Sequence, residues 1–237
     1  MTLPRIKEGR VVAVCIGDEP GPKREVSEIE LVSGGVVGDC HFGGAREVSV
    51  LPKEALDDAA KTANRALTAG TFAENILTEG IDWARVWRDS LVVAGDVVLE
   101  PHQRGKEHCG VCSVAKKVGF CIGDEELVFC RVLRGGRLKV GMRIKVVRAD
   151  VWNERVVSGE LGETARFLRR RLRKTHLTLF LLPQKRLFVI KGQDKNASLL
   201  VESFVEGRFG VARWEELDAA ARLETLQRGI CVYRRGL

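Results

Sequence analysis

The residues best suited to chemistry lie between Gly105 and Cys112, where the sequence reads GKEHCGVC. Cys109 and Cys112 are three positions apart, and Lys106 and His108 lie beside them. A cysteine reacts and binds metal as its thiolate, which neighbouring cations favour. The segment therefore predicts either sulfur chemistry or the binding of a thiophilic metal.

The composition is typical of a globular protein with reduced thiols. The chain has 237 residues, of which 45% are hydrophobic, and it contains no run of about 18 apolar residues that could cross a membrane. Its seven cysteines do not indicate a disulfide framework, and residues 1–10 lack the apolar core of a secretory signal. We therefore expect a cytoplasmic location and no contact with a membrane.

The formal net charge of +7 lies entirely in the C-terminal third of the chain. This asymmetry and a change of pattern after Asp150 predict two domains, residues 1–150 and 151–237. The run RRRLRK at 169–174 makes the second domain basic. Because the run lacks the aromatic residues that usually accompany nucleic-acid binding, we favour an acidic partner protein over nucleic acid.

The first domain is predicted to be mainly β, a barrel with short capping helices. Short segments rich in Val, Ile and Leu are separated by turn residues, as in strands. These segments are 11–16, 28–32, 47–51, 90–93, 96–100 and 142–147. One longer helix is expected from Pro52 to Leu67, with alanine and leucine at helical spacing. It would cap the barrel.

The second domain is predicted to be a small α+β module. Helical patterns cover 160–174, 196–206 and 214–227, and strand patterns cover 177–182 and 187–191. Residues 183–185 are a plausible hairpin connection between the two strands. The sequence offers no recognisable catalytic motif in this domain.

Several motifs follow one another in a fixed order along residues 10–148. They read GGVVGDCH at 34–41, REVSVL at 46–51, GTFAENILTEGI at 70–81, LE at 99–100 and GK at 105–106. Gly119, Cys121, Phe129 and Gly135-Gly136 continue the series. Together these motifs resemble the MOSC domain, the C-terminal domain of molybdenum cofactor sulfurases, in its short bacterial type. The resemblance implies a barrel-like fold that handles molybdenum cofactor, a pterin dithiolene.

The family uses a cysteine that carries sulfur as a persulfide or binds molybdenum, and Cys112 matches its position best. Short members usually read Gly-Lys-x-Cys-His-x-x-Cys, whereas His108 and Cys109 stand in swapped order here. Members that reduce N-hydroxylated compounds carry a Cys-x-x-Cys pair, with the second thiolate on molybdenum. The resemblance therefore implies Cys112 and Cys109 as catalytic residues and Cys112 as the metal ligand, in sulfur transfer or in reduction of N-hydroxylated substrates. Ile122-Gly123-Asp124 departs from the family's usual Met-Pro continuation, which affects the expected substrate.

A pterin phosphate would need cations and polar donors around it. Candidate cofactor-binding residues are Arg46, Lys106, His108, His41, Asn75 and Thr78. Strand alternation sends Asn75 to the face opposite Thr78, so they cannot all face one pocket. Each has a structural alternative: His41 could cap a turn at Asp39, and Arg46 could pair with Glu47 or Asp39. Asn75 could stabilise a turn, and Lys106 could be solvated.

Other functions fit the same cysteines. A zinc-stabilised interaction module would combine Cys109 and Cys112 with His102, His108, Cys121 or Cys130. A thioredoxin-like redox pair has the same spacing, but the expected βαβ context is weak. A non-catalytic protein that delivers cofactor is a third alternative. The remaining cysteines, Cys15, Cys40, Cys130 and Cys231, are expected to be inert core residues.

Full sulfurases carry a pyridoxal-phosphate desulfurase domain ahead of the MOSC domain. We expect no such domain here, because about ten residues precede the resemblance. Any persulfide sulfur would then come from another protein.

Overall fold

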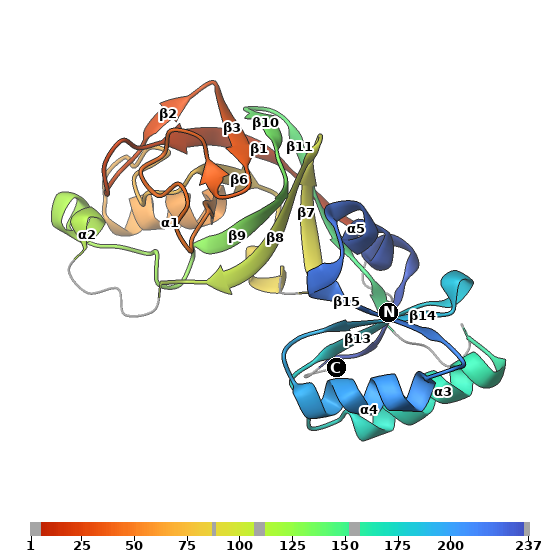
Figure 1. Ribbon diagram of the computed structural model, residues 1–237. Coiled ribbons are helices and arrows are strands. Elements are labelled where there is room, and N and C mark those ends of the chain that lie inside the picture. Colours follow the sequence, from red (N-terminus) through yellow and green to blue (C-terminus); the bar gives the residue numbers. More distant parts are fainter. Residues whose placement is uncertain (1–5, 87–88, 107–111, 152–156, 235–237) are drawn as a thin grey trace. The chain divides into compact units, whose positions relative to one another are not determined.

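The computed structural model describes residues 6–86, 89–106, 112–151 and 157–234. The chain divides into two compact units, residues 1–146 and 147–237. Figure 1 shows that the first unit is built mostly of strands, whereas helices and a sheet share the second.

Seven strands of the first unit form a closed β-barrel. Their order is β1-β11-β7-β8-β9-β5-β6, and β6 pairs again with β1. β5 and β6 run parallel, while β9 is antiparallel to both of its neighbours, β5 and β8. The strands are β1 (Ile6–Ile16), β5 (Val48–Pro52), β6 (Ile76–Glu79), β7 (Ser90–Ala94), β8 (Val97–Arg104), β9 (Val128–Arg134) and β11 (Arg143–Arg148). The prediction of a mainly β, barrel-type fold is confirmed.

Four short strands extend this framework. β2 (Arg24–Val26) pairs with the end of β1, and a separate sheet has the order β10-β3-β4. Its members are β3 (Glu28–Val32), β4 (Gly35–Val36) and β10 (Gly136–Lys139). The loop after β4 leads directly into residues 37–47.

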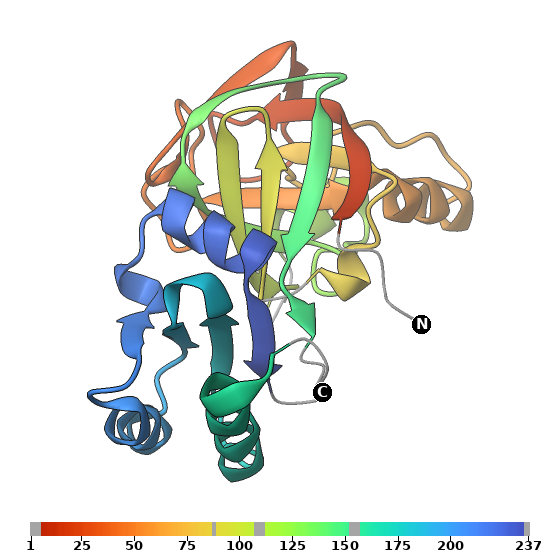
Figure 2. The same cartoon turned by 90° about the vertical axis from the view of Figure 1, so that its right-hand side faces the viewer.

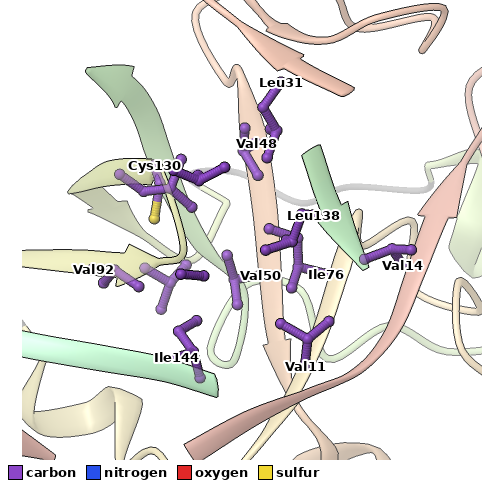
Figure 3. Packing of buried hydrophobic residues seen from close by; sticks show 14 of the residues in the cluster. Val11, Val14, Leu31, Val48, Val50, Ile76, Val92, Cys130, Leu138 and Ile144 are labelled. Carbon is purple, nitrogen blue, oxygen red and sulfur yellow. The ribbon is translucent and has the colours of Figure 1, made fainter. Parts of the chain in front are cut away.

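The barrel interior is filled by β-branched side chains. Val11, Val50, Ile76 and Ile144 are almost completely buried and lie close together in Figure 3. Branched side chains pack well on pleated strands, which explains why the Val- and Ile-rich segments form this core. Cys130 belongs to the same core, as expected of an inert thiol.

The longest helix of the first unit is shorter than predicted. α1 (Lys53–Thr62) begins after Pro52 as expected but ends five residues before Leu67. Asn64, with φ of +48°, adopts a left-handed conformation that a continuing α-helix does not allow. Among the described residues of this unit, the other helical elements are the single turn η1 (Trp83–Arg85) and α2 (Ser113–Val118).

The second unit is an α+β module, as predicted. Its five-stranded sheet has the order β12-β16-β13-β14-β15. The strands are β12 (Asp150–Val151), β13 (Thr178–Leu182), β14 (Leu187–Lys191), β15 (Gly210–Arg213) and β16 (Ile230–Tyr233). The helices are α3 (Gly159–Arg171), α4 (Lys195–Val205) and α5 (Ala219–Arg228), with single turns η2 (Pro183–Lys185) and η3 (Trp214–Glu216).

Both faces of this sheet are covered. Leu179 and Leu181 of β13 pack in a cluster with α3 and α4, which lie side by side in Figure 2. Phe180 packs against Trp214, with ring centroids 5.6 Å apart. The expected helix 214–227 is divided into η3 and α5, because Leu217 is extended between them.

Across the described ranges, no helix has the length and hydropathy needed to span a bilayer.

Candidate functional site

Cys112 is the residue that precedes α2, and its side chain is half-buried. The backbone N–H of Ala115 donates a hydrogen bond to its Sγ, at 3.4 Å. Sulfur accepts such a bond either as thiol or as thiolate, and the thiolate is the form that binds metals. The fold therefore fixes this sulfur in one orientation at the start of the helix.

An apolar cluster lies beneath Cys112. The cluster contains the buried residues Phe72, Val114 and Phe129, and both Cys112 and Cys121 pack against its margin. The Sγ of Cys121 accepts a hydrogen bond from the N–H of Gly123, at 3.3 Å. Two half-buried thiols thus border one apolar cluster.

Gly105 and Lys106 are positioned by the segment that follows Cys121. The φ of Gly105 is +69°, and a Cβ at this position would lie 1.8 Å from the carbonyl oxygen of Asp124. Glycine is therefore required where the backbone at position 105 passes so close to the backbone of Asp124. Lys106 donates its N–H to the carbonyl of Gly123 at 3.0 Å, is half-buried, and makes no ion pair within the described ranges.

Arg46 lies over an aromatic ring of the same apolar cluster. Its guanidinium carbon is 5.0 Å from the centroid of the Phe129 ring, within the range of a cation–π interaction. The alternative that Arg46 pairs with Glu47 or Asp39 is wrong. Glu47 instead accepts the N–H of Val132, and Arg46 has no carboxylate partner among the residues that the structure describes.

Asp39 and Lys23 form an ion pair inside the first unit. Lys23 Nζ lies 2.7 Å from Asp39 Oδ2, and the two side chains are 1% and 3% exposed. The Nδ2 of Asn75 and the N–H of Gly17 also donate to Oδ2, at 3.0 and 3.2 Å. Burial opposes ionisation of Asp39, but hydrogen bonds from His41 and Lys23 outweigh it and hold the pKa of Asp39 well below its usual value.

The loop between β1 and β2 joins this ion pair to α2. At its start, Gly17 contacts Asp39, and further along Glu19 pairs with Lys117 of α2 at 3.0 Å. The helix that follows Cys112 and the buried carboxylate therefore share one supporting loop.

Asn75 and Thr78 have their polar atoms bonded within the fold. The Asn75 side chain is buried, and its Oδ1 accepts from the N–H and the hydroxyl of Ser49. Thr78 has no exposed surface, and its hydroxyl oxygen accepts from Trp83 Nε1 at 2.7 Å. These bonds hold β5, β6 and η1 together. Binding of a cofactor by either side chain stays a prediction.

Glu74, which precedes Asn75, is a completely buried carboxyl. Its two oxygens accept the N–H groups of Gly70 and Phe72, at 2.7 and 3.1 Å. Burial nevertheless dominates and raises the pKa of Glu74 to about 7. The group thus titrates near neutral pH inside the fold.

Cys40 and His41 are exposed on the loop between β4 and β5. The expectation that Cys40 is an inert core residue is wrong, whereas Cys15 and Cys231 are buried as expected. The His41 N–H donates to Asp39 Oδ1 at 3.0 Å, so the predicted turn at Asp39 is present. His41 Nδ1 also lies 3.2 Å from Asp39 Oδ1 and 3.1 Å from Cys40 Sγ.

His108 and Cys109 lie outside the described residues, so their proposed roles stay predictions. The zinc alternative places Cys130 in the ligand set, but that thiol is enclosed in the barrel core. Within the described parts of the chain, one group of three metal-ligating side chains converges: Asp39, Cys40 and His41. None of the proposed zinc ligands belongs to it.

Sequence reasoning missed Lys23. Asp39 was considered only as a turn residue and as a possible partner of Arg46, and no local pattern links it to a lysine 16 positions away. The one sequence signal was indirect, since a buried aspartate needs a cationic or N–H partner.

The first unit is similar to known proteins in sequence and in fold. The model of the MOSC domain matches residues 37–145. The YuaD protein of Bacillus subtilis has a similar structure, with a TM-score of 0.50 and 16% sequence identity, over 60% of this chain and 96% of that one. YiiM of Geobacillus stearothermophilus has a TM-score of 0.48 and 20% sequence identity, over 60% of this chain and 77% of that one. YiiM of Escherichia coli has a TM-score of 0.44 and 16% sequence identity, over 67% of this chain and 84% of that one. No curated protein sequence matches this chain.

Proposed function

Because residues 37–145 of this chain form a MOSC domain, we propose that the first unit binds molybdenum cofactor with the Cys112 sulfur as a ligand of molybdenum. The supporting observation is the half-buried sulfur itself. It is oriented by the Ala115 N–H and lies at the margin of an apolar cluster. Thiolates are soft ligands that suit a thiophilic metal, and a half-buried position suits a held ligand better than a mobile carrier.

The cations around this cluster fit the anionic end of the cofactor. Arg46 and Lys106 make no ion pair in the described parts of the chain, so both charges are available to a phosphate. The stacking of Arg46 on Phe129 fixes the direction of its guanidinium group. We assign the binding of the pterin phosphate to these two residues. His108, predicted to bind the cofactor, and Cys109, predicted to be catalytic, lie between Lys106 and Cys112 in the sequence.

Reduction of N-hydroxylated compounds is the activity that we propose for the loaded protein. Bound molybdenum cofactor supplies two-electron redox chemistry. In the net reaction the N–O bond breaks, two electrons and two protons are taken up, and water leaves. An external reductant provides the electrons. Lys106 and Arg46 would bind and orient the cofactor, and Cys112 would hold its metal.

The test is metal and pterin analysis of protein made in a host that produces molybdenum cofactor. We expect about one molybdenum per chain in the wild type and in Cys121→Ser, a matched control because Cys121 borders the same cluster. Cys112→Ser should lose the metal. Retention of molybdenum by Cys112→Ser would contradict the proposal. Reduction of hydroxylamine-type substrates by the loaded protein separates an enzyme from a delivery protein, and a persulfide on Cys112 without bound metal would instead indicate a sulfur carrier.

For the second unit we propose an acidic partner protein. Arg169, Arg170, Arg171, Arg173 and Lys174 end or follow α3, and no carboxylate pairs with them in the described ranges. The neighbouring aromatic rings already have partners. Phe167 stacks on Phe204 with centroids 4.0 Å apart, and Arg171 and Arg208 lie over these two rings. Neither of these two described rings therefore offers a free face on which a nucleic-acid base could stack.

Binding assays with an acidic peptide and with single-stranded RNA test this choice. We expect the peptide to bind and the affinity to fall as salt is raised, because the cations are exposed. Replacement of Arg170, Arg173 and Lys174 by Gln should abolish binding. Replacement of Arg134, Arg137 and Lys145 in the first unit serves as the control of equal charge. Preferential binding of RNA would contradict the proposal.

A further inference from the structure

Three metal-ligating atoms meet on the loop between β4 and β5, away from the sulfur of Cys112 in the sequence. His41 Nδ1 lies 3.1 Å from Cys40 Sγ and 3.2 Å from Asp39 Oδ1, and the sulfur is 4.0 Å from the same oxygen. A tetrahedral zinc site, with metal–ligand distances of about 2.0–2.3 Å, separates its ligand atoms by about 3.3–3.8 Å. The three atoms therefore have nearly the spacing of three corners of such a site.

The carboxylate of Asp39 is held in place through its other oxygen, Oδ2. Lys23, Asn75 and Gly17 all donate to Asp39 Oδ2, and Lys23 Nζ and Asp39 are almost fully buried. Oδ1 is therefore the oxygen turned toward Cys40 and His41. Partners of this kind, which bind the second atom of a ligand and fix its orientation, are typical of metal sites.

Hydrogen bonds satisfy this arrangement only in part. If Nδ1 of His41 carries a proton, it can donate to Asp39 Oδ1 at 3.2 Å, and the Cys40 thiol then has only a long contact of 4.0 Å with the same oxygen. If Nδ1 is bare, it can accept the Cys40 S–H at 3.1 Å, but its lone pair then also faces the carboxylate oxygen at 3.2 Å. The Asp39 turn explains the backbone bond from the His41 N–H but not the convergence of the thiol and the imidazole on one oxygen. A divalent cation would accept a lone pair from all three atoms at once.

We propose that Asp39, Cys40 and His41 bind one zinc ion. Sulfur, imidazole nitrogen and carboxylate oxygen together suit a borderline-soft metal such as zinc and not magnesium or calcium, which prefer oxygen ligands. Cys40 is exposed and the His41 side chain is 45% exposed. The fourth coordination position is therefore accessible to water or to a small ligand, as in zinc sites that are not purely structural. This site is separate from the molybdenum ligand proposed above and does not depend on it.

Cobalt(II) reports on such a site directly, because its bond to a thiolate gives a charge-transfer absorption and zinc displaces it. The full-length protein, made without molybdenum cofactor and freed of metal, is titrated with Co²⁺ alone and then with Zn²⁺. We expect one Co²⁺ per chain with thiolate absorption, and its displacement by one equivalent of zinc. Cys40→Ser should abolish the absorption, and His41→Gln should weaken binding at least about tenfold.

The controls distinguish this site from the other cysteines. Cys112→Ser and Cys121→Ser should bind cobalt as the wild type does, and so should His176→Gln, which removes another exposed histidine. Cys40 is exposed, so Cys40→Ser should leave the thermal unfolding temperature unchanged, whereas His41→Gln removes a hydrogen bond to the buried Asp39 carboxylate and should lower it slightly. Unaltered cobalt absorption in Cys40→Ser, its loss in Cys112→Ser, or no cobalt binding by the wild type would each overturn the proposal. Because no pterin is present, these outcomes are independent of the molybdenum experiment.

Discussion

The ammonium group of Lys23 lies 2.7 Å from the carboxylate of Asp39, where both side chains are almost inaccessible to water. An ion pair in such a place stabilises the fold only as a pair, since either charge alone would be buried without compensation. Asn75 and Gly17 complete the hydrogen bonding of the carboxylate. The pair therefore links the β1–β2 loop to the loop that carries Cys40 and His41.

Lys23→Met is expected to destabilise the first unit by about 3–5 kcal/mol, because it leaves the Asp39 charge buried without its cation. Arg10→Met is a suitable control, since Arg10 also pairs at 2.7 Å, with Glu79, but its side chain is 63% exposed. Arg10→Met should lower the free energy of unfolding by less than about 1 kcal/mol. Urea unfolding measures both. Equal losses would show that burial does not determine the strength of the Lys23 pair.

Acid should weaken the same pair. The pKa of Asp39 is lower in the folded chain than in the unfolded chain, because hydrogen bonds from His41 and Lys23 outweigh the effect of burial. Its contribution to stability is therefore present above the unfolded pKa of about 3.9 and is lost as the pH falls toward the lower folded value. Lys23→Met should show a smaller loss of unfolding free energy between pH 5 and pH 2 than the wild type. An unchanged loss would contradict this account.

Glu74 should give the opposite pH dependence. Burial raises its folded pKa to about 7, so its contribution is fully present below the unfolded pKa of about 4.3 and is lost as the pH rises toward 7. Glu74→Gln replaces the titratable carboxyl group by an amide, so this pH dependence disappears. The stability of the wild type relative to Glu74→Gln should therefore be greater at pH 5 than at pH 7.5. A constant difference across this range would mean that Glu74 is ionised throughout.

The barrel could be predicted because several of its strands show a local sequence pattern typical of strands. The segments 11–16 and 90–93 are rich in branched residues, and they fall within the barrel strand β1 and form most of β7. β9 was missed because Arg131 and Arg134 interrupt its apolar pattern. The helix at 53 was predicted too long, since alanine-rich spacing does not reveal the left-handed residue at Asn64.

The candidate site was only partly accessible to such reasoning. Cys112 and Lys106 were found because their segment is chemically unusual on its own. The Lys23–Asp39 pair joins residues from different loops, and only the folded chain brings them together. Cys40 was misjudged for a related reason, because exposure depends on how the β4–β5 loop folds and not on its neighbours in sequence.

Gly105→Ala should destabilise the first unit strongly, by about 3 kcal/mol or more, because the new Cβ would meet the Asp124 carbonyl at 1.8 Å. Gly119→Ala is a matched control. Gly119 also has a positive φ, of +94°, but a Cβ there meets no atom within 4 Å. It should show only the backbone strain of about 1–2 kcal/mol. Urea unfolding compares the two, and similar losses would mean that the chain near Gly105 relaxes freely.

Thr78→Val tests whether this side chain is structural or binds a cofactor. Valine has nearly the same shape but leaves Trp83 Nε1 buried without its acceptor at 2.7 Å. The expected loss is about 1–3 kcal/mol of unfolding free energy, whereas Thr78→Ser keeps an acceptor and should restore part of it. Measurement of retained molybdenum below the unfolding temperature completes the test. If Thr78 is structural, folded Thr78→Val retains as much metal as the wild type, because the hydroxyl oxygen faces the indole. A loss of metal from folded Thr78→Val would instead support the prediction that Thr78 contacts the cofactor.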